Sequence, residues 1–340
     1  MSSIMPLPTT QLIDVKDRAP GKASVARSLS AADPRSPFLA LLRPSQWVKN
    51  IVVFAGPAAG LKLSSADALN SAALTFAAFC LAASSSYVLN DIFDREADRS
   101  HPTKRNRPVA AGRIGAGAAL SMAGVLLAGC LTVTTLFLPL GVTVVLAFYW
   151  VMTLVYSAWL KERVILDVIV IAVGFVLRAL AGSLAVGVPA SEWLVACVFT
   201  LCLFMGFGKR RCEIAMIGDA ENISRHRRTL VRYTPDLLNH LLTVSAGITI
   251  ITFLLYTLDA QHPAPFHKEH LFYTLPLVVY GVFRFAMLTE LGAHTGPTEI
   301  VLRDRAILLT IILWTACALV VAYQSALFGP QGLSRLFGVG

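Results

Sequence analysis

The sequence predicts an all-α polytopic membrane protein, and three observations lead to that fold class. Of the 340 residues, 56% are apolar and only 14% are charged, whereas soluble proteins average about 25% charged residues. The mean hydropathy is +0.66. The apolar residues gather in runs long enough to cross a bilayer as helices, which need about 20 residues each. A disordered chain, a secreted disulfide scaffold and an ordinary cytosolic domain are therefore excluded.

We expect nine transmembrane helices from these runs. Open sheets cannot cross lipid, so the spans should form a helical bundle. The first span is the weakest, because it is short and begins with Gln46, Lys49 and Asn50. The expected spans are residues 45–62, 67–90, 115–136, 139–157, 164–187, 192–208, 237–258, 271–289 and 306–328.

The basic residues predict the orientation of the chain. Most of the 29 Lys and Arg residues fall on the N-terminal segment and on alternate connections, and the opposite connections hold only Lys62, Lys268 and Arg335. Cytoplasmic segments of membrane proteins are enriched in Lys and Arg, so we expect a cytoplasmic N-terminus. The net charge of +9 has the same origin, and we expect the bilayer, and no nucleic acid, as a partner.

Three segments are expected along the chain. Residues 1–40 are rich in Ser, Pro, Ala and basic side chains and lack the apolar stretch of a signal peptide, which indicates a disordered cytoplasmic tail. Residues 41–330 form the nine-helix transmembrane catalytic domain, and residues 331–340 form a short C-terminal tail.

An acidic motif follows the second expected span. Asp91, Asp94 and Asp98 are spaced i, i+3, i+7, and they project from one face if the helix continues. Carboxylates suit Mg²⁺, which typically takes one or two of them together with substrate phosphates. We therefore expect these three residues to bind Mg²⁺ and to be the catalytic group. The alternative is a solvated helix end whose acids pair with Arg95 and Arg99.

A basic loop comes next. Lys104, Arg105 and Arg107 lie just beyond the acidic motif, between prolines that prevent a long helix. Carboxylates for a metal beside cations for phosphate oxygens make up a diphosphate site. The alternative is an ordinary basic cytoplasmic loop.

The run NDIFDREADRSHPTKRNRPVAAG, from Asn90 to Gly112, resembles the first aspartate-rich motif of the UbiA-type intramembrane prenyltransferase superfamily. The resemblance implies nine transmembrane helices around a central cavity, with a metal-bound diphosphate at the cytoplasmic face. Members that prenylate aromatic rings carry a second aspartate-rich motif between spans six and seven. Here that place holds the basic run from Gly208 to Glu213, and Asp219 and Glu221 follow without the motif's spacing.

The whole pattern is similar to the decaprenyl-phosphate phosphoribosyltransferase branch of this superfamily. Four further segments carry the similarity: residues 44–50, 156–161, 167–182 and 299–305. Enzymes of this branch transfer ribose 5-phosphate from phosphoribosyl diphosphate (PRPP) to a polyprenyl phosphate, which starts the route to lipid-linked arabinose for the cell wall. The resemblance implies Mg²⁺ as cofactor and a bacterial inner-membrane enzyme with a cytoplasmic active site. Homo-oligomers are an option, and small residues such as Ala181 and Gly182 permit helix contacts.

The chemistry of this reaction suggests a role for each polar group. The metal would neutralise the departing diphosphate, and a single displacement predicts inversion at the anomeric carbon. Lys209 and Arg210 could hold a phosphate on the other side of the site. The expected substrate-binding residues are Lys49, Asn90, Lys104, Arg105, Arg107, Tyr156, Lys161, Asp167, Arg178, Lys209 and Arg210.

Alternatives remain for several of these residues and for the function. Asp167 and Arg178, three helical turns apart on the fifth span, are also explained by structural ion pairs. Lys49, Tyr156 and Lys161 are also explained as interfacial anchors. A prenyltransferase that moves an isoprenoid from its diphosphate to an aromatic acceptor is the second functional hypothesis. A transporter of anionic or lipid-phosphate cargo is the third, although transporter charges usually lie near the midplane.

Overall fold

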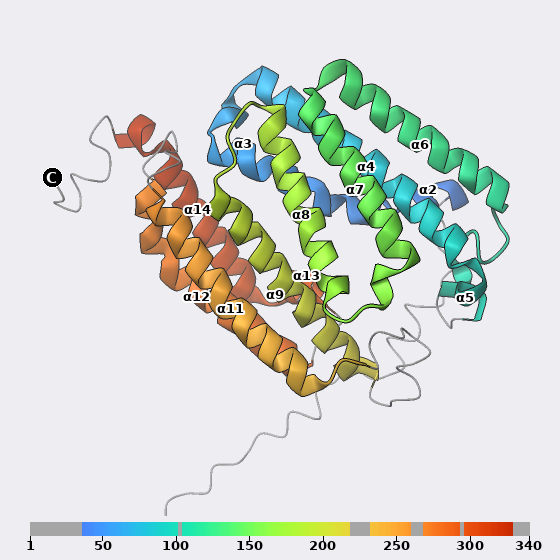
Figure 1. Ribbon diagram of the computed structural model, residues 1–340. Coiled ribbons are helices and arrows are strands. Elements are labelled where there is room, and N and C mark those ends of the chain that lie inside the picture. Colours follow the sequence, from blue (N-terminus) through green and yellow to red (C-terminus); the bar gives the residue numbers. More distant parts are fainter. Residues whose placement is uncertain (1–35, 101–103, 218–231, 260–267, 293–295, 329–340) are drawn as a thin grey trace, which may run out of the picture. The chain divides into compact units, whose positions relative to one another are not determined.

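The computed structural model describes residues 36–100, 104–217, 232–259, 268–292 and 296–328, and within these ranges the regular elements are all helices (Figure 1). Eight helical stretches in the described ranges are long and apolar enough to cross a membrane, which confirms an all-α membrane protein. They are α4 (Ala66–Phe93), α6 (Ala116–Phe137), α7 (Leu140–Ala158), α8 (Leu166–Ala185), α9 (Glu192–Ile217), α11 (Pro235–Leu258), η7 (Lys268–Thr274) with α12 (Leu275–Glu290), and α14 (Arg305–Phe328). Most of the two expected tails lies outside the described residues.

The first expected span has a different structure from the others. It consists of a 3₁₀ segment, η2 (Pro44–Phe54), and a short helix, α3 (Ala55–Ala59), between α2 (Pro37–Leu42) and η3 (Lys62–Ser64). This segment is too short and irregular to belong to the eight apolar helices. The count of nine spans and the orientation of the N-terminus therefore stay predictions.

Small residues let this N-terminal segment pack directly on α8. A Cβ atom on Gly182 would lie 1.8 Å from the carbonyl oxygen of Val53, and one on Gly56 would lie 1.9 Å from Oγ of Ser183. Glycine is required where two backbones approach this closely. The small-residue face at Ala181 and Gly182, which we expected to permit helix contacts, is thus covered by η2 of the same chain.

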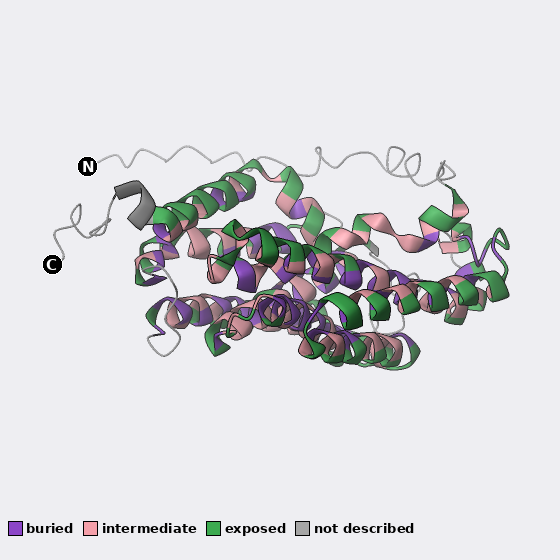
Figure 2. Ribbon diagram, turned by 90° about the horizontal axis from the view of Figure 1, so that it is seen from above, coloured by how far each residue is buried: buried purple, intermediate pink, exposed green. Residues whose placement is uncertain are grey.

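The long helices pack in a row of neighbours that runs from α6 through α4, α7, α8, α9, α11 and α12 to α14 (Figure 1). Among the eight, α4 and α8 are the most buried. One apolar cluster joins α4, α7 and α8, and another joins α8, α9, α11 and α12. Figure 2 shows buried and exposed residues on different faces of the same helices. Exposed Leu, Val and Phe side chains on these helices are expected where the surrounding solvent is lipid.

Two helix ends are important for the site. Helix α9 was expected to stop at residue 208, but it continues to Ile217, so the basic run is helical. Helix α11 begins at Pro235, where Thr234 accepts a 3.1 Å hydrogen bond from the backbone N–H of Leu237. Both are favourable N-terminal features, because proline is tolerated in the first turn and the threonine side chain satisfies a free donor.

Candidate functional site

The acidic motif does not lie on one continuous helix. Helix α4 ends at Phe93, Asp94 takes a non-helical conformation at the C-cap, and the short α5 (Arg95–Ser100) follows. This interruption changes the geometry that the i, i+3, i+7 spacing predicts for a continuing helix. Asp91 and Asp98 are buried, whereas Asp94 is only partly buried.

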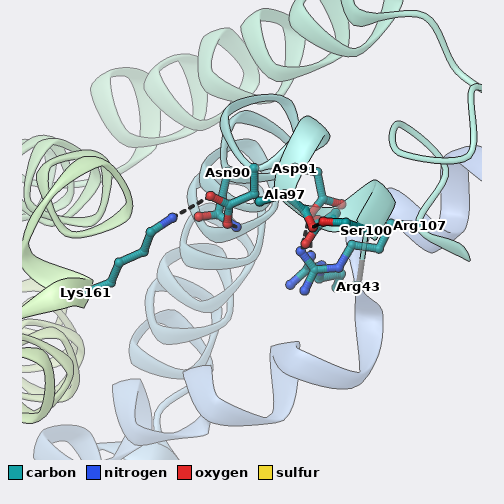
Figure 3. A network of polar contacts seen from close by, with 9 residues as sticks. Arg43, Asn90, Asp91, Ala97, Ser100, Arg107 and Lys161 are labelled. Atoms are coloured by element: carbon teal, nitrogen blue, oxygen red, sulfur yellow. Dashed lines mark hydrogen bonds and ion pairs between the residues drawn. The ribbon is translucent and has the colours of Figure 1, made fainter. Parts of the chain in front are cut away.

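Asp91 and Asp98 converge on one cation. Nη1 of Arg107 lies 3.2 Å from Oδ1 of Asp91 and 2.7 Å from Oδ2 of Asp98. Arg43, the residue between α2 and η2, donates a second, shorter hydrogen bond to Oδ1 of Asp91. In Figure 3, Arg43 and Arg107 gather on the same side of Asp91. Two buried carboxylates are therefore balanced by two arginines, which come from segments far apart in the sequence.

Asp94 has different partners from the other two aspartates. Nζ of Lys161, from η5 (Leu160–Glu162), lies 2.5 Å from Oδ1 of Asp94. Nδ2 of Asn90 donates a 3.1 Å hydrogen bond to the other carboxylate oxygen. Figure 3 shows Lys161 approaching from the side opposite to the two arginines. Among the described residues, no three His, Cys, Asp or Glu side chains form a group that could hold a metal. The assignment of all three aspartates to one metal thus stays a prediction.

A second polar cluster joins α8, α9 and the start of α11. Nε of Arg210 donates a 2.9 Å hydrogen bond to Oδ2 of Asp167, and its Nη1 lies 2.6 Å from Oε2 of Glu213. The hydroxyl of Tyr233 donates a 2.7 Å hydrogen bond to Oδ1 of Asp167 and accepts one from the backbone N–H of Ile165. Burial and the adjacent Asp167 carboxylate raise the pKa of Tyr233. The positions of Asp167 and Arg210 favour a structural role.

Arg178 belongs to a third, buried cluster. It donates hydrogen bonds to Oδ1 of Asn50 (2.7 Å), the carbonyl oxygen of Gly174 (2.8 Å) and the hydroxyl of Tyr149 (2.9 Å). The guanidinium also lies 4.7 Å from the centre of the Tyr149 ring, which is a favourable cation–π distance. These acceptors are all neutral, and no ion pair of Arg178 with a described residue is present.

The remaining predicted residues lie at the edges of these clusters. Lys104 and Arg105 are in η4 (Lys104–Asn106), and Arg105 is exposed. Tyr156, on α7, is half-buried and acts electrostatically on Arg210. Lys49 and Lys209 are exposed side chains next in sequence to the fully buried Asn50 and Arg210.

The structure adds residues that sequence reasoning missed. Arg43 lies 48 positions before its partner Asp91, and Tyr233 lies 66 positions after Asp167. Local spacing gives no signal for such contacts, because they depend on the packing of separate helices. An arginine directly before the polar 44–50 segment was the one feature that could have suggested Arg43.

Comparison with known proteins agrees with the family resemblance that the sequence motifs indicate. The profile of the UbiA prenyltransferase family matches residues 51–294. A decaprenyl-phosphate phosphoribosyltransferase from Mycolicibacterium smegmatis is 34% identical over 82% of this chain and 90% of its own length. The protein of that name from Corynebacterium glutamicum is 32% identical over 94% of both chains.

A solved structure of a UbiA homologue from Archaeoglobus fulgidus, bound to GPP and Mg²⁺, superposes with a TM-score of 0.65. It is 19% identical, and the match covers 84% of this chain and 100% of that one. This likeness supports the fold.

Proposed function

From the premise that the chain belongs to the UbiA prenyltransferase family, we propose that it transfers 5-phosphoribose from PRPP to decaprenyl phosphate and releases pyrophosphate. The relatives named for this activity are 32–34% identical over most of the chain. We also propose that the enzyme lies in the bacterial inner membrane with its site at the cytoplasmic face.

The observation that carries the proposal is the division of the polar residues into an acidic and a basic part. Asp91 and Asp98 share one cation near the end of α4. The extended end of α9 carries Lys209, Arg210 and Arg211, where prenylating members of the superfamily carry a second acidic motif. PRPP has a diphosphate at one end and a phosphomonoester at the other, so one acidic, metal-binding part and one basic part suit it.

The residues of the acidic part fit Mg²⁺. Oxygen atoms of Asp91 and Asp98 already face a single positive nitrogen of Arg107, and carboxylate oxygens are the ligands that Mg²⁺ prefers. Asp91 and Asp98, with Asp94 as a further ligand, would hold the ion. When bound, Mg²⁺ would neutralise negative charge on the diphosphate leaving group.

The protein's own residues would position the reactants. Arg43 and Arg107 would donate to diphosphate oxygens, and Lys161 with Asn90 would keep Asp94 in place. An oxygen of the lipid phosphate attacks the anomeric carbon while the bond from that carbon to the diphosphate oxygen breaks. The lipid phosphate is ionised near neutral pH, since its second pKa is about 6, so no general base is needed. A single displacement inverts the anomeric carbon, and catalysis rests on positioning and charge stabilisation.

A transfer assay on the purified protein tests this function. The reaction would contain labelled PRPP, decaprenyl phosphate and either Mg²⁺ or EDTA. We expect label in the lipid phase with Mg²⁺ only, and at least a tenfold lower rate for Asp94→Asn. Labelled prenyl diphosphate with aromatic acceptors is the comparison reaction. Prenyl transfer in that reaction, without phosphoribosyl transfer, would identify an aromatic prenyltransferase instead and overturn the proposal.

A further inference from the structure

We propose that Ser84 is a positioning residue, which holds Arg43 in place for the diphosphate of the substrate. Ser84 lies in the second half of α4, before the aspartate-rich segment, and is 1% exposed. This inference rests on the proposed function, in which Arg43 donates to diphosphate oxygens. It assigns a role to a buried hydroxyl group that would itself touch no reactant.

The hydroxyl of Ser84 holds the chain on both sides of Arg43. It donates a 2.9 Å hydrogen bond to the carbonyl oxygen of Leu42 and accepts a 3.0 Å hydrogen bond from Nε1 of Trp47. Leu42 is the last residue of α2, and Trp47 lies in η2. The last carbonyl groups of a helix have no partner within it, so Ser84 supplies an acceptor group with its missing donor. The turn that contains Arg43 is thus attached to α4 at two points.

The backbone of Arg43 needs such support. Its φ of 50° and ψ of 58° lie in the left-handed region, which is unfavourable for any residue with a Cβ atom. Pro44 follows and restricts the conformation of Arg43 further. Leu41, which is 0% exposed, anchors α2 in an apolar cluster with Val88 of α4. The contacts with α4 therefore stabilise a backbone conformation that the local sequence does not favour.

The side chain of Arg43 lies along the same face of α4. Ser84, Tyr87 and Asp91 are spaced i, i+3, i+7, so they share one face of this helix. Cζ of Arg43 lies 5.1 Å from the centre of the Tyr87 ring, and the guanidinium donates to Asp91. Ser84 thus fixes the backbone of the arginine, while Tyr87 and Asp91 direct its guanidinium.

Arg43 keeps donors available for a ligand. Its side chain is 24% exposed, and Asp91 is its only hydrogen-bond acceptor among the described residues. A guanidinium carries several N–H donors in a fixed planar arrangement. The arginine can therefore keep its bond to Asp91 and donate to a diphosphate oxygen as well, provided that its backbone stays in place.

The next residue, Ser85, makes the same two kinds of hydrogen bond with other partners. Its Oγ donates a 2.9 Å hydrogen bond to the carbonyl oxygen of Ala123 and accepts a 3.3 Å hydrogen bond from Nε1 of Trp150. Ser85 is 0% exposed, and its bonds join α4 to α6 and α7 rather than to the turn of Arg43. Ser85 is therefore a matched control, with equal chemistry and burial on the same helix.

Calorimetric titration of the full-length protein in detergent with pyrophosphate and Mg²⁺ tests the inference independently of turnover. The single variants are Ser84→Ala, Ser85→Ala and Arg43→Gln, and the double variant combines Ser84→Ala with Arg43→Gln. Thermal unfolding shows that each variant is folded. Trp47→Phe, with Trp150→Phe as its control, removes one donor from each serine and keeps an aromatic ring in place. This second pair carries the same comparison if Ser84→Ala does not fold.

We expect Arg43→Gln to bind pyrophosphate about 10- to 100-fold more weakly, as for the loss of one charge-assisted hydrogen bond. Ser84→Ala should bind it about 3- to 10-fold more weakly, as for the loss of a neutral hydrogen bond. Ser85→Ala should lower the melting temperature to a similar extent but change the affinity by less than about twofold. Trp47→Phe should weaken binding, and Trp150→Phe should not.

The double variant distinguishes positioning from a general structural role. If Ser84 acts through Arg43, Ser84→Ala should have almost no further effect on pyrophosphate affinity in the Arg43→Gln protein, because coupled residues are not additive. Independent, additive losses would overturn the inference. Equal losses of affinity in Ser84→Ala and Ser85→Ala, or unchanged affinity in Ser84→Ala, would overturn it too.

The transfer assay separates this inference from the proposed function. If the wild type transfers phosphoribose while Ser84→Ala binds pyrophosphate normally, the positioning role fails and the function stands. If the wild type transfers nothing but the variants bind pyrophosphate as expected, the reverse holds. Absence of pyrophosphate binding by the wild type would overturn the role of Arg43, and the role of Ser84 with it.

Discussion

Arg210 and Asp167 form an ion pair with 2.9 Å between Nε and Oδ2, and their side chains are 2% and 0% exposed. This pair ties the first turn of α8 to the extended end of α9. It therefore holds the basic run of α9 against the bundle, and its own members are withdrawn from solvent.

Removal of one member should destabilise the fold strongly. We expect Asp167→Leu to cost about 3 kcal/mol, because the buried guanidinium of Arg210 keeps only Glu213 as an ionic partner among the described residues and the hydroxyl of Tyr233 loses its acceptor. Thermal unfolding in detergent would measure the effect. The double variant Asp167→Leu, Arg210→Met should recover much of the loss, since apolar pairs can replace buried ion pairs. A double variant less stable than either single variant would contradict this structural role.

Tyr233→Phe should also destabilise the protein, but by less. The change leaves the backbone N–H of Ile165 without its acceptor and removes a donor to Asp167, so we expect a loss of about 1 to 3 kcal/mol. Tyr256→Phe is the matched control, because Tyr256 is similarly buried and its hydroxyl has no hydrogen bond within the described residues. Equal melting temperatures for the two variants would speak against the Tyr233 contacts.

Gly182→Ala tests the contact between the N-terminal segment and α8. The new Cβ would clash with the backbone oxygen of Val53 at 1.8 Å, and overpacking of this kind costs about 1 to 3 kcal/mol. Gly124→Ala, on α6, meets no atom within 4 Å and should be neutral or slightly stabilising. The melting temperatures of the two variants are compared with that of the wild type. A Gly182→Ala variant as stable as the wild type would mean that η2 packs less closely on α8 than the structure shows.

The contribution of Asp304 should depend on pH. Arg284 donates two 2.8 Å hydrogen bonds to its carboxylate, and these lower the pKa of Asp304. A lowered folded-state pKa stabilises the protein above the unfolded value of about 3.9, and this contribution is lost as the pH falls through the folded value. Asp304→Asn should thus lower the free energy of unfolding at pH 7 by about 1 kcal/mol, as for a partly exposed pair. The melting temperature at pH 7 should fall with it.

The difference between wild type and Asp304→Asn should shrink below pH 4 or so. Asp236→Asn, which removes an exposed carboxylate in the first turn of α11, should cost less at pH 7. A difference for Asp304→Asn that stays constant down to pH 3 would show that its charge is not what matters.

Most spans could be predicted from hydropathy because a helix that crosses lipid must be apolar along its whole length. The second and third expected spans, 67–90 and 115–136, differ from Ala66–Phe93 and Ala116–Phe137 by only a few residues. The end of α9 could not be predicted in this way. Its charged residues read as a loop, yet Arg210 and Glu213 pair at i, i+3 and continue the helix.

The residue types of the candidate site could be predicted from the sequence better than the contacts between them. Two of the expected pairings of opposite charge are present: Arg107 forms an ion pair with Asp98, and Lys161 forms one with Asp94. Arg43 and Tyr233 were missed because their partners come from other helices, and the interruption at Asp94 was missed because hydrophilic residues continue smoothly through it. Such features depend on tertiary packing, which overrides local preference.

The lengths of α4 and α9 have a consequence for where the two reactants of the proposed transfer would meet. With 28 and 26 residues, these helices extend about 42 and 39 Å at 1.5 Å per residue, beyond the roughly 30 Å of a hydrocarbon core. Their charged C-terminal ends can therefore stand at the depth of the lipid headgroups. A water-soluble sugar phosphate could reach that level from the aqueous side, and a lipid phosphate already resides there. Neither reactant would have to bring its charged groups into the hydrocarbon core of the bilayer.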